Sequence, residues 1–304
     1  MFKNYKYNFR KAFSIIEISI VVLFVGILIV GISNGVDLYN DFIILKAKNL
    51  TLNSRVGRIP DLNLWLETTT DKSFLASEKY NNSPISTWNA LDLNSSNIIS
   101  ATQSNYNFKP KYIVNGFNGL PVVRFEGKDS DTLNSDYMNL PDEVIPYDNS
   151  DYSVFIVAKK TLNNPTRNIV LCGGSIIDST TRSINAFGFI DNNAMNYWYP
   201  ISSTINSPAN SIMSNIFYIT EFFYDKNSIA NRSIYINGSK VVEGDRGSRM
   251  STKYKNFLGR RSDFTTNYFD GDLGELIVFE RALNNSERKS VEEYLFKKWN
   301  ISAY

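Results

Sequence analysis

The chain has 304 residues, of which 32 are basic and 30 acidic, so its formal net charge is only +2. This balance argues against a nucleic-acid-binding protein, in which basic residues concentrate on one surface. Histidine is absent, which excludes histidine metal sites and every catalytic triad or dyad that needs an imidazole. The single cysteine, Cys172, excludes an internal disulfide, and its apolar neighbours predict a buried thiol.

A membrane-spanning segment is predicted directly after a short basic leader. Residues 1–12 contain Lys3, Lys6, Arg10 and Lys11 and no acidic side chain. The following residues, 13–32, are mostly apolar and as a helix would span about 30 Å, the thickness of the hydrocarbon core of a bilayer. The basic leader predicts a single-pass inner-membrane protein with a cytoplasmic N-terminus and an exported remainder.

One carboxylate interrupts this apolar run. Glu17 lies near its start, and a charge that lies deep in the membrane costs about 2.5–3.5 kcal/mol. One interpretation is a glutamate at the membrane interface, where the positive end of the helix dipole stabilises it. The other is a charge pair between Glu17 and the free amino group of a chain that begins at Phe13, in the same molecule or in a neighbour.

The junction Lys11-Ala12-Phe13-Ser14-Ile15-Ile16-Glu17 resembles the N-terminal segment of type IV prepilins and pseudopilins. The resemblance covers roughly residues 1–35. It implies cleavage between Ala12 and Phe13 by a prepilin peptidase, N-methylation of Phe13, and assembly with other pilin subunits through Glu17. Ala12 stands where this family nearly always has glycine.

The N-terminal helix is predicted to continue beyond the apolar run as a stem. Apolar side chains recur there at three- and four-residue steps, which indicates one apolar stripe; they are Val36, Tyr39, Ile43, Ala47 and Leu50. Pro60 ends the helical pattern. The predicted division is therefore a leader at 1–12, a transmembrane and stem helix at 13–58, and a second domain at 61–304.

The second domain is predicted to be an antiparallel β-sandwich. Short β-type runs alternate with Asn, Asp, Ser and Gly; the candidate strands are 62–66, 122–125, 153–158, 169–172, 186–190, 217–224, 232–236, 240–242, 256–258 and 271–279. Asn237-Gly238 lies between two of them and predicts a type I′ hairpin. Because helices do not alternate with these strands, one sandwich is favoured over an α/β fold.

A short amphipathic helix is predicted at the C-terminal end. Asn284 and Glu287 have the spacing of a capping box. One face of the helix carries four apolar side chains, Val291, Tyr294, Leu295 and Trp299. The fold class is thus an N-terminal transmembrane and stem helix followed by an antiparallel β-sandwich, or jelly roll, with a short C-terminal helix that packs on it.

Several sequence strings follow one another through the second domain. They are LNLWL at 62–66, NGLPVVRFEG at 118–127, YSVFIV at 152–157, YING at 235–238, FDGDLGEL at 269–276 and YLFKKW at 294–299. In this order they resemble bacterial laminin-G-like domains of the concanavalin A-like lectin/glucanase superfamily. The resemblance implies a jelly-roll domain that serves exported proteins as a recognition or scaffolding module.

No catalytic residues and no cofactor are predicted. Retaining glycosidases need two carboxyl groups about 5–5.5 Å apart, and the nearest string, Asp270 to Glu275, has its carboxylates in the wrong order for the glucanases of this superfamily. The acidic residues Asp129, Asp131 and Asp148 offer oxygen ligands for calcium. Short acidic loops are more often simply solvated, so we assign no metal ligands and predict a non-enzyme.

Aromatic side chains are the candidates for ligand binding. Trp88 and the consecutive Tyr197, Trp198 and Tyr199 would offer platforms for a sugar beside polar groups. The competing interpretation is that large aromatic side chains at strand spacing fill the sandwich core. Core filling is favoured for Trp65 and Trp299, whereas asparagines near Tyr197 and Tyr199 suggest the edge of a loop.

The sequence as a whole predicts a non-enzymatic pilin-like subunit, either a minor pilin or a pseudopilin. It would be processed by a prepilin peptidase, held in the lipid bilayer, and assembled into an extracellular fimbrium with other pilin subunits. Its lectin-like domain would bind a glycan or a protein surface in adhesion. Two alternatives stay open: a membrane-anchored lectin-like protein that keeps its leader because of Ala12, and a pseudopilin of a type II secretion system.

Overall fold

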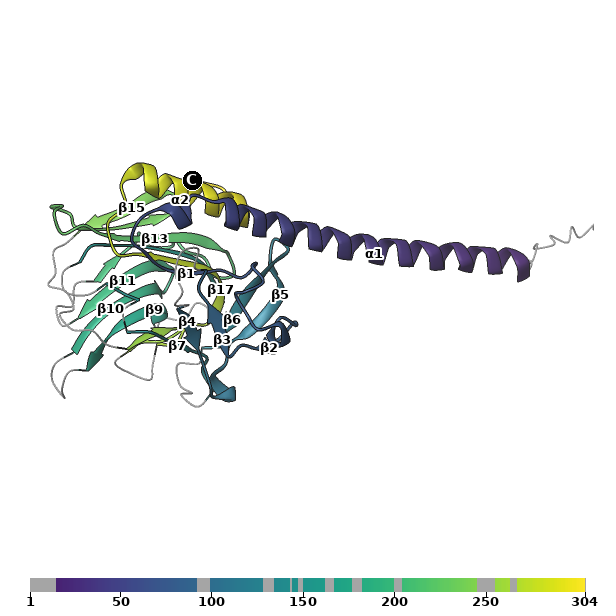
Figure 1. Ribbon diagram of the computed structural model, residues 1–304, viewed down its shortest axis with the longest axis horizontal. Helices are drawn as coiled ribbons and strands as arrows, with labels where there is room; N and C mark the ends of the chain where they lie inside the picture. Colours follow the sequence, from purple (N-terminus) through teal and green to yellow (C-terminus); the bar gives the residue numbers. More distant parts are fainter. Residues whose placement is uncertain are drawn as a thin grey trace, which may run out of the picture. The chain divides into compact units, whose positions relative to one another are not determined.

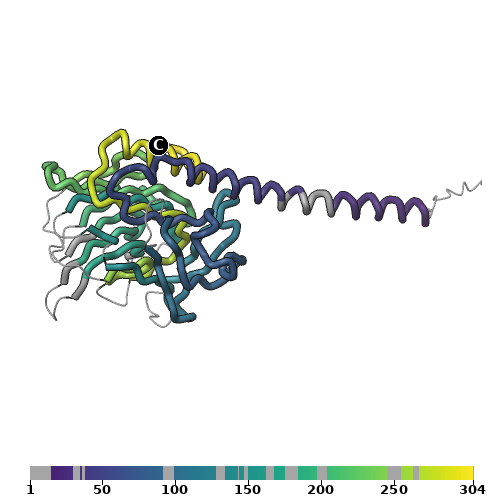
Figure 2. The backbone as a smooth tube through the Cα atoms, viewed as in Figure 1, coloured from purple at the N-terminus to yellow at the C-terminus, as the bar shows by residue number. Residues whose placement is uncertain are grey.

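The computed structural model describes residues 15–91, 99–127, 134–142, 144–146, 150–161, 167–176, 182–199, 204–244, 255–262 and 267–303. The chain divides into two compact units, Met1–Ile43 and Ile44–Tyr304, which are described separately. The second unit, called the head unit below, contains two β-sheets and the C-terminal helix (Figures 1 and 2). The predicted processing residues Ala12 and Phe13 lie outside the described residues.

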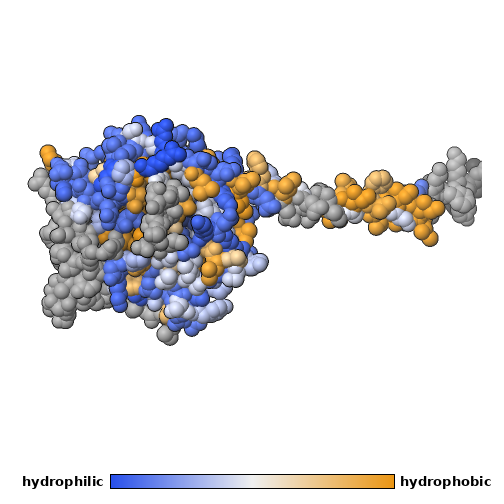
Figure 3. All heavy atoms as spheres, viewed as in Figure 1, coloured by the Kyte–Doolittle hydropathy of each residue, from blue (hydrophilic) through white to orange (hydrophobic). Residues whose placement is uncertain are grey.

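The first long helix, α1 (Ile15–Asn53), is continuous. Its large apolar side chains from Ile15 to Ile29 are exposed by 48–83%, and Figure 3 shows them in orange. Glu17 lies in the first turn and is exposed. No helix in the described part of the chain combines the length and the apolar character needed to cross a membrane, so the span predicted for residues 13–32 is not found there.

The end of α1 belongs to the head unit. Ala47 and Thr51 are buried, and the Thr51 hydroxyl lies 2.9 Å from the Tyr294 hydroxyl. A 3₁₀ turn, η1 (Val56–Arg58), follows before the first strand. Two further 3₁₀ turns, η2 (Ala76–Glu78) and η3 (Tyr106–Phe108), lie in connections between strands. Within the head unit, Ala47 and Thr51 are therefore the packed positions at the end of α1. Ala47 was part of the predicted apolar stripe, and Thr51 was not.

Within the described residues, one sheet has nine strands and every pairing is antiparallel. Its order is β15-β14-β13-β8-β17-β6-β5-β2, with β1 also paired to β17. The strands are β1 (Leu62–Leu66), β2 (Ser83–Pro84), β5 (Lys111–Phe117), β6 (Leu120–Phe125), β8 (Tyr152–Lys160), β13 (Tyr218–Tyr224), β14 (Arg232–Ile236), β15 (Ser239–Gly244) and β17 (Gly271–Phe279). This sheet carries the C-terminal helix.

The second sheet has eight strands in the described part of the chain, in the order β12-β11-β10-β9-β16-β7-β4-β3. They are β3 (Thr87–Asn89), β4 (Ser100–Thr102), β7 (Met138–Leu140), β9 (Arg167–Ile176), β10 (Arg182–Ile190), β11 (Asn193–Tyr199), β12 (Thr204–Asn206) and β16 (Asn256–Leu258). All its pairings are antiparallel as well. The predicted antiparallel sandwich is confirmed.

The main core lies between the two sheets. Side chains alternate along a strand, so Phe222 of β13 points inward and meets Phe187 of β10, with ring centroids 5.3 Å apart. Trp88 of β3 belongs to the same core, is fully buried, and lies 5.4 Å from the ring of Phe74. Its indole nitrogen donates to the backbone oxygen of Glu67 at 2.9 Å.

The C-terminal helix α2 (Asn285–Trp299) covers the outer face of the nine-stranded sheet. The predicted capping box is present, because Asn284 accepts from the Glu287 backbone and Glu287 accepts from the Asn284 backbone. All four predicted apolar positions of the helix are buried. Trp299 packs so closely on β17 that a Cβ at Gly274 would lie 2.6 Å from its ring, which explains the glycine there.

Beneath α2 lies a fully buried ion cluster of Glu67, Glu275 and Lys298. The Lys298 amine lies 2.9 Å from a carboxylate oxygen of Glu67 and 3.0 Å from one of Glu275. Burial opposes the charge of Glu67, yet Lys298 and nearby hydroxyl donors outweigh it and hold the pKa of this carboxyl well below its usual range. Burial likewise opposes the charge of Lys298, and the two carboxylates outweigh it and raise the pKa of the amine.

Candidate functional site

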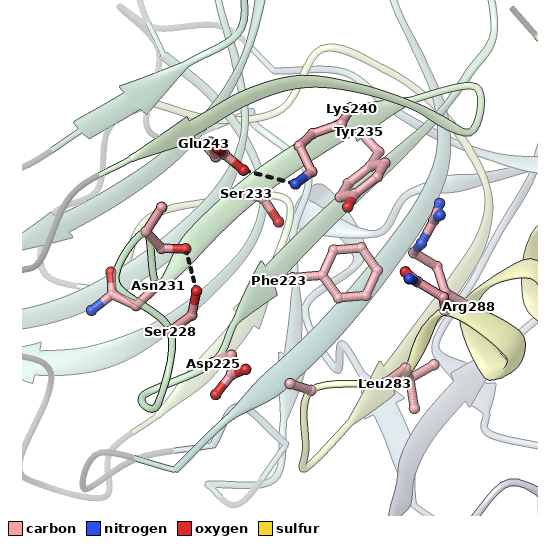
Figure 4. A pocket seen from close by; sticks show the side chains of 13 residues that line it. Phe223, Asp225, Ser228, Asn231, Ser233, Tyr235, Lys240, Glu243, Leu283 and Arg288 are labelled. Carbon is pink, nitrogen blue, oxygen red and sulfur yellow. Dashed lines mark hydrogen bonds and ion pairs between the residues drawn. The ribbon is translucent and has the colours of Figure 1, made fainter.

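A pocket of about 180 Å³ opens on the outer face of the nine-stranded sheet. Strands β13, β14 and β15 form its floor and one wall, and the turn before α2 with the first turn of that helix closes the other side (Figure 4). We call it the outer pocket. Its lining includes Phe223, Asp225, Asn231, Tyr235, Lys240 and Arg288.

Strand alternation explains why these side chains share one face. Phe222 and Ile234 point into the sandwich core, so the neighbouring Phe223 and Tyr235 point outward. The tight Asn237-Gly238 turn, with φ of 47° and 80°, sets the register of β14 and β15 and brings Lys240 opposite Tyr235. The confirmed type I′ hairpin thus builds one wall of the outer pocket.

Tyr235 is the central aromatic side chain of the outer pocket and is half-buried. Phe223 meets it edge-on, with ring centroids 5.4 Å apart and an interplanar angle of 75°. The Arg288 guanidinium carbon lies 4.4 Å from the centre of its ring, and the Lys240 amine lies 5.8 Å from it. Figure 4 shows the two cations on either side of the ring. These contacts hold the ring in place by cation–π attraction.

Both cations of the lining already have a carboxylate partner. Lys240 lies 2.7 Å from Glu243, and this hydrogen bond raises the pKa of the amine. Arg288 is paired with Glu292 through its Nη1 atom, which also lies 3.9 Å from Glu221. The charges around the outer pocket are therefore largely neutralised by one another.

Two polar atoms of the lining are buried without a hydrogen-bond partner in the described residues. They are the Asn231 side-chain oxygen, an acceptor, and the Arg288 Nε atom, a donor. Leaving such a group unpaired costs about 1–3 kcal/mol. Both atoms have almost no accessible surface, so a ligand in the outer pocket does not reach them in this arrangement of side chains.

Next to Arg288 lies a carboxyl pair, Glu221 and Glu292. Glu221 is fully buried. Burial, and next the charge of Glu292, raise the pKa of Glu221 well above its usual range. The folded protein therefore holds a proton on this pair at a pH at which an exposed glutamate has lost it.

Replacing Glu221 by glutamine should stabilise the protein at neutral pH by on the order of 1 kcal/mol, or about 2–4 °C in Tm. Because the folded pKa is raised, wild-type stability falls as the pH rises from the unfolded value toward the folded one. The glutamine variant does not lose stability in this way, so its gain in stability over wild type should shrink as the pH falls toward 4. Thermal unfolding of both chains from about pH 4 to 8 tests this, with the exposed Glu293→Gln as control. A stability difference between the two chains that does not change with pH would contradict this prediction.

The acidic string at the start of β17 is structural. Asp272 is fully buried and pairs with Arg124 at 2.7 and 3.0 Å and with Lys159 at 2.8 Å. Glu275 accepts from the indole nitrogens of Trp65 and Trp299 at 2.6 and 2.8 Å. Neither carboxylate reaches the outer pocket. In the described residues no group of acidic or cysteine side chains is arranged to hold a metal ion, and Asp129, Asp131 and Asp148 lie outside those residues.

The aromatic candidates from the sequence fall in other places. The prediction for Trp88 is wrong, because this side chain is fully buried in the core and offers no ring face to a ligand. Tyr197, Trp198 and Tyr199 belong to β11, where they pair with Ala186, Asn185 and Ile184 of β10; their side chains lie outside the described part of the structure. Cys172 is buried, as predicted.

Sequence reasoning missed the residues of the outer pocket. Tyr235 was predicted only as part of a hairpin strand. Its alternation with the apolar Ile234 and Ile236 was the available signal that its ring lies on the outer face of the sheet. Asn231 and Arg288 carry no such signal. They are separated by more than 50 positions and meet around one pocket only because α2 packs on β13 and β14.

These features define a lectin-type sandwich: two antiparallel sheets, a helix on the outer face of one, and a shallow polar pocket with an aromatic side chain. Residues 132–287 match a laminin-G-type family described as the concanavalin A-like lectin/glucanases superfamily. The chain belongs to this superfamily. A search of curated protein sequences found no match.

Several solved structures are similar to this chain at low sequence identity. The sialidase of Trypanosoma rangeli, in complex with sialic acid, has a TM-score of 0.50 and 13% identity over 79% of this chain and 33% of its own. The CBM40 domain of a Ruminococcus gnavus IT-sialidase has a TM-score of 0.41 and 14% identity over 47% of this chain and 83% of its own. The K499G mutant of the NanB sialidase of Streptococcus pneumoniae has a TM-score of 0.44 and 13% identity over 55% of this chain and 26% of its own. The chain thus spans about a third of the Trypanosoma enzyme.

Proposed function

We propose that the sandwich is a carbohydrate-binding, lectin-like module and that the outer pocket is its binding site. The observation that carries this proposal is the half-buried Tyr235 ring, which lies in a pocket among amide, hydroxyl and charged side chains. Ligand sites typically combine aromatic surface with a few polar groups that fix orientation. The volume, about 180 Å³, is below the roughly 300–1,000 Å³ of sites for drug-sized ligands, which suits a single sugar residue.

We propose binding without catalysis. The carboxylates nearest in sequence to a glucanase pattern, Asp272 and Glu275, are engaged in buried hydrogen bonds and ion pairs. In the outer pocket, Glu243 and Glu292 are held by Lys240 and Arg288. Incubation of the full chain with the oligosaccharides that it binds, followed by product analysis, should return them unhydrolysed.

Replacing Tyr235 by alanine should weaken glycan binding about tenfold or more, because the substitution removes the aromatic surface and releases the two cations that pack on it. Titration calorimetry of the full chain with a neutral oligosaccharide identified on a glycan array measures the effect. Tyr106→Ala is the matched control, because Tyr106 is 72% exposed and lies outside the pocket lining. Equal affinities for the Tyr235 and Tyr106 variants would exclude the outer pocket as the glycan site.

Tyr197, Trp198 and Tyr199 stay a proposed second point of contact with a glycan. Their position on β11, one strand from the edge of the eight-stranded sheet, supports this, since edges of a sheet are accessible to ligands. Binding that survives Tyr235→Ala and is lost on replacing Tyr197 and Tyr199 would locate the glycan there.

We also propose that the chain is a pilin-like subunit that displays this module. The long α1 helix, with its exposed apolar side chains from Ile15 to Ile29, supports the proposal, because a large apolar surface is usually covered by lipid or protein partners. The partners would be the lipid bilayer of the inner membrane before assembly and other pilin subunits in an extracellular fimbrium afterwards. A pseudopilin of a type II secretion system and an unprocessed membrane anchor are the alternatives.

Processing provides the test of the pilin-like role. Intact-mass measurement and N-terminal sequencing of the chain recovered from its native membrane should show a methylated Phe13 at the N-terminus. Ala12→Leu should then retain the leader and give the mass of the unprocessed chain. A native chain that still begins at Met1 would contradict processing and favour the membrane-anchored alternative.

A further inference from the structure

The eight-stranded sheet carries an arginine set among aromatic side chains. Arg260 follows β16, and Phe108, Tyr137, Phe257 and Tyr268 lie around it. We propose that this group, called the Arg260 site, is a second binding site of the lectin-like module and takes a sugar residue that bears a carboxylate. The inference rests on the proposed glycan binding of the module, but it uses residues that are not part of the outer pocket.

Strand alternation explains why the Arg260 site lies outside the main core. Met138 of β7 and Leu258 of β16 belong to the core between the sheets. Tyr137 and Phe257 precede them in sequence and therefore point to the opposite, outer face of the eight-stranded sheet. Arg260 contacts both of these rings, so its guanidinium lies on the outer face as well.

Aromatic side chains hold the guanidinium of Arg260 in place. Its central carbon lies 4.2 Å from the centre of the Tyr137 ring and 4.0 Å from the centre of the Phe257 ring, and these two rings are inclined by 71°. The guanidinium also donates a hydrogen bond to the Tyr268 hydroxyl. Phe108 packs on Tyr137, with ring centroids 5.4 Å apart. A planar guanidinium held in this way presents its remaining N–H groups in a fixed orientation.

The charge of Arg260 is not neutralised by a carboxylate within the described residues. In contrast, Arg124, Arg281 and Arg288 each contact a carboxylate. The Nε atom of Arg260 is buried, but the side chain stays partly exposed, so the end that carries the two Nη atoms is the part that a ligand can reach. A cation that is partly removed from water and lacks a counter-ion attracts an anion more strongly than a fully hydrated cation does.

An ionised carboxylate on a sugar ring meets the requirements of the Arg260 site. Its two oxygens accept parallel hydrogen bonds from a guanidinium, and such charged hydrogen bonds are stronger than those of a neutral hydroxyl. Phe108 and Tyr137 are partly exposed beside the cation and offer apolar surface to the ring carbons of a sugar. This combination of a cation with aromatic surface favours an acidic sugar, such as a uronic or a sialic acid residue, over an acidic peptide.

Sugars that differ in one acidic group test the inference on the full chain. The probes are cellobiouronic acid with cellobiose, 3′-sialyllactose with lactose, and a tetraglutamate peptide as an anion that is not a sugar. In titration calorimetry we expect at least one acidic sugar to bind about tenfold or more tightly than its neutral counterpart. Arg260→Gln should remove this preference. Arg260→Lys keeps the charge but loses the planar fork, so it should retain only part of the preference.

Two controls accompany these variants, and thermal unfolding verifies that each variant is folded. Arg58→Gln removes the charge of an exposed arginine in η1 and should bind the acidic sugar as wild type does, which separates the Arg260 site from a general effect of net charge. Tyr235→Ala alters the outer pocket and should leave the preference for the acidic sugar unchanged.

The outcomes separate the failure of this inference from the failure of the proposed function. Equal affinities for acidic and neutral sugars, a preference that survives Arg260→Gln, or a preference that is lost on Tyr235→Ala would overturn the inference and leave glycan binding in place. Tetraglutamate that binds through Arg260 as tightly as the acidic sugar would overturn the assignment to a sugar. Absence of binding to every sugar, including those of the glycan array, would overturn the proposed function and this inference with it.

Discussion

Replacing Lys298 by methionine should lower the free energy of unfolding by about 3–5 kcal/mol at neutral pH, as expected when one partner of a buried ion pair is removed. The amine contacts Glu67 and Glu275 at 2.9 and 3.0 Å, and all three side chains are fully buried. Methionine fills a similar volume and leaves two carboxylates without their cation. Chemical denaturation followed by tryptophan fluorescence measures the effect, because Trp65 and Trp299 both donate to Glu275.

The neighbouring residue provides a matched control. Lys297 is on the same helix, is 62% exposed, and pairs with Glu293 across one turn. Lys297→Met should change the free energy of unfolding by less than about 1 kcal/mol, the usual limit for an exposed ion pair. Equal denaturation midpoints for the two variants would contradict a stabilising role for the buried ion cluster.

The pH dependence of the Lys298 variant provides an independent check. In wild type the pKa of Glu67 is held low, so its contribution to stability is present at neutral pH and is lost as the pH falls toward the folded pKa. Without Lys298 the carboxylates are unpaired, and protonation removes the penalty of their burial. The difference between wild type and Lys298→Met should therefore shrink as the pH falls, and adding Glu67→Gln and Glu275→Gln should recover part of the loss at pH 7.

Replacing Trp88 by alanine should destabilise the head unit by about 3–5 kcal/mol, because the substitution leaves a cavity in a close-packed core. The indole is fully buried, packs on Phe74 at 5.4 Å, and donates to the Glu67 backbone at 2.9 Å. Glycan affinity, measured at a temperature where the variant is folded, should match that of wild type. Denaturation and calorimetry on the same preparation report the two quantities separately.

Tyr80→Ala serves as the control for this substitution, because Tyr80 is 69% exposed and its removal should alter stability by no more than about 0.5 kcal/mol. A Trp88 variant with wild-type stability and reduced glycan affinity would return Trp88 to the ligand site. The two outcomes thus distinguish core filling from sugar binding for a residue that strand spacing alone left ambiguous.

Glycan binding and the pilin-like role, as proposed, would use different parts of the molecule. The apolar part of α1 would provide attachment, and the outer pocket, on the face of the sandwich that carries α2, would provide recognition. Within the head unit, the Tyr294 hydroxyl of α2 joins Glu275 of the buried ion cluster at 2.6 Å to Thr51 at 2.9 Å. A substitution that loosens α2 is then expected to affect both the pocket wall and the contact between Tyr294 and Thr51.

Local patterns in the chain were enough to predict much of the fold. All ten candidate strands coincide with observed strands, and 62–66, 232–236, 256–258 and 271–279 agree at both ends. The capping box and the Asn237-Gly238 turn were also correct. Turns, helix caps and period-two alternation involve residues close in sequence, so they can be predicted without knowledge of tertiary contacts. Seven observed strands were missed. Five of them, β2, β3, β4, β7 and β12, have two or three residues, too few to show a period of their own. The other two, β5 and β11, have seven residues each.

The outer pocket and the buried ion cluster depend on the folded chain. Glu67 and Lys298 are separated by 231 positions, and neither has a neighbour in sequence that marks it as buried. A single charged residue in a sequence is predicted to be solvent-exposed, because burying a charge is favourable only when a partner from another part of the chain compensates for its desolvation. Tyr235, Asn231 and Arg288 likewise form one site only after β14 pairs with β13 and α2 packs across them. The architecture follows from short-range preferences, whereas the site follows from long-range packing.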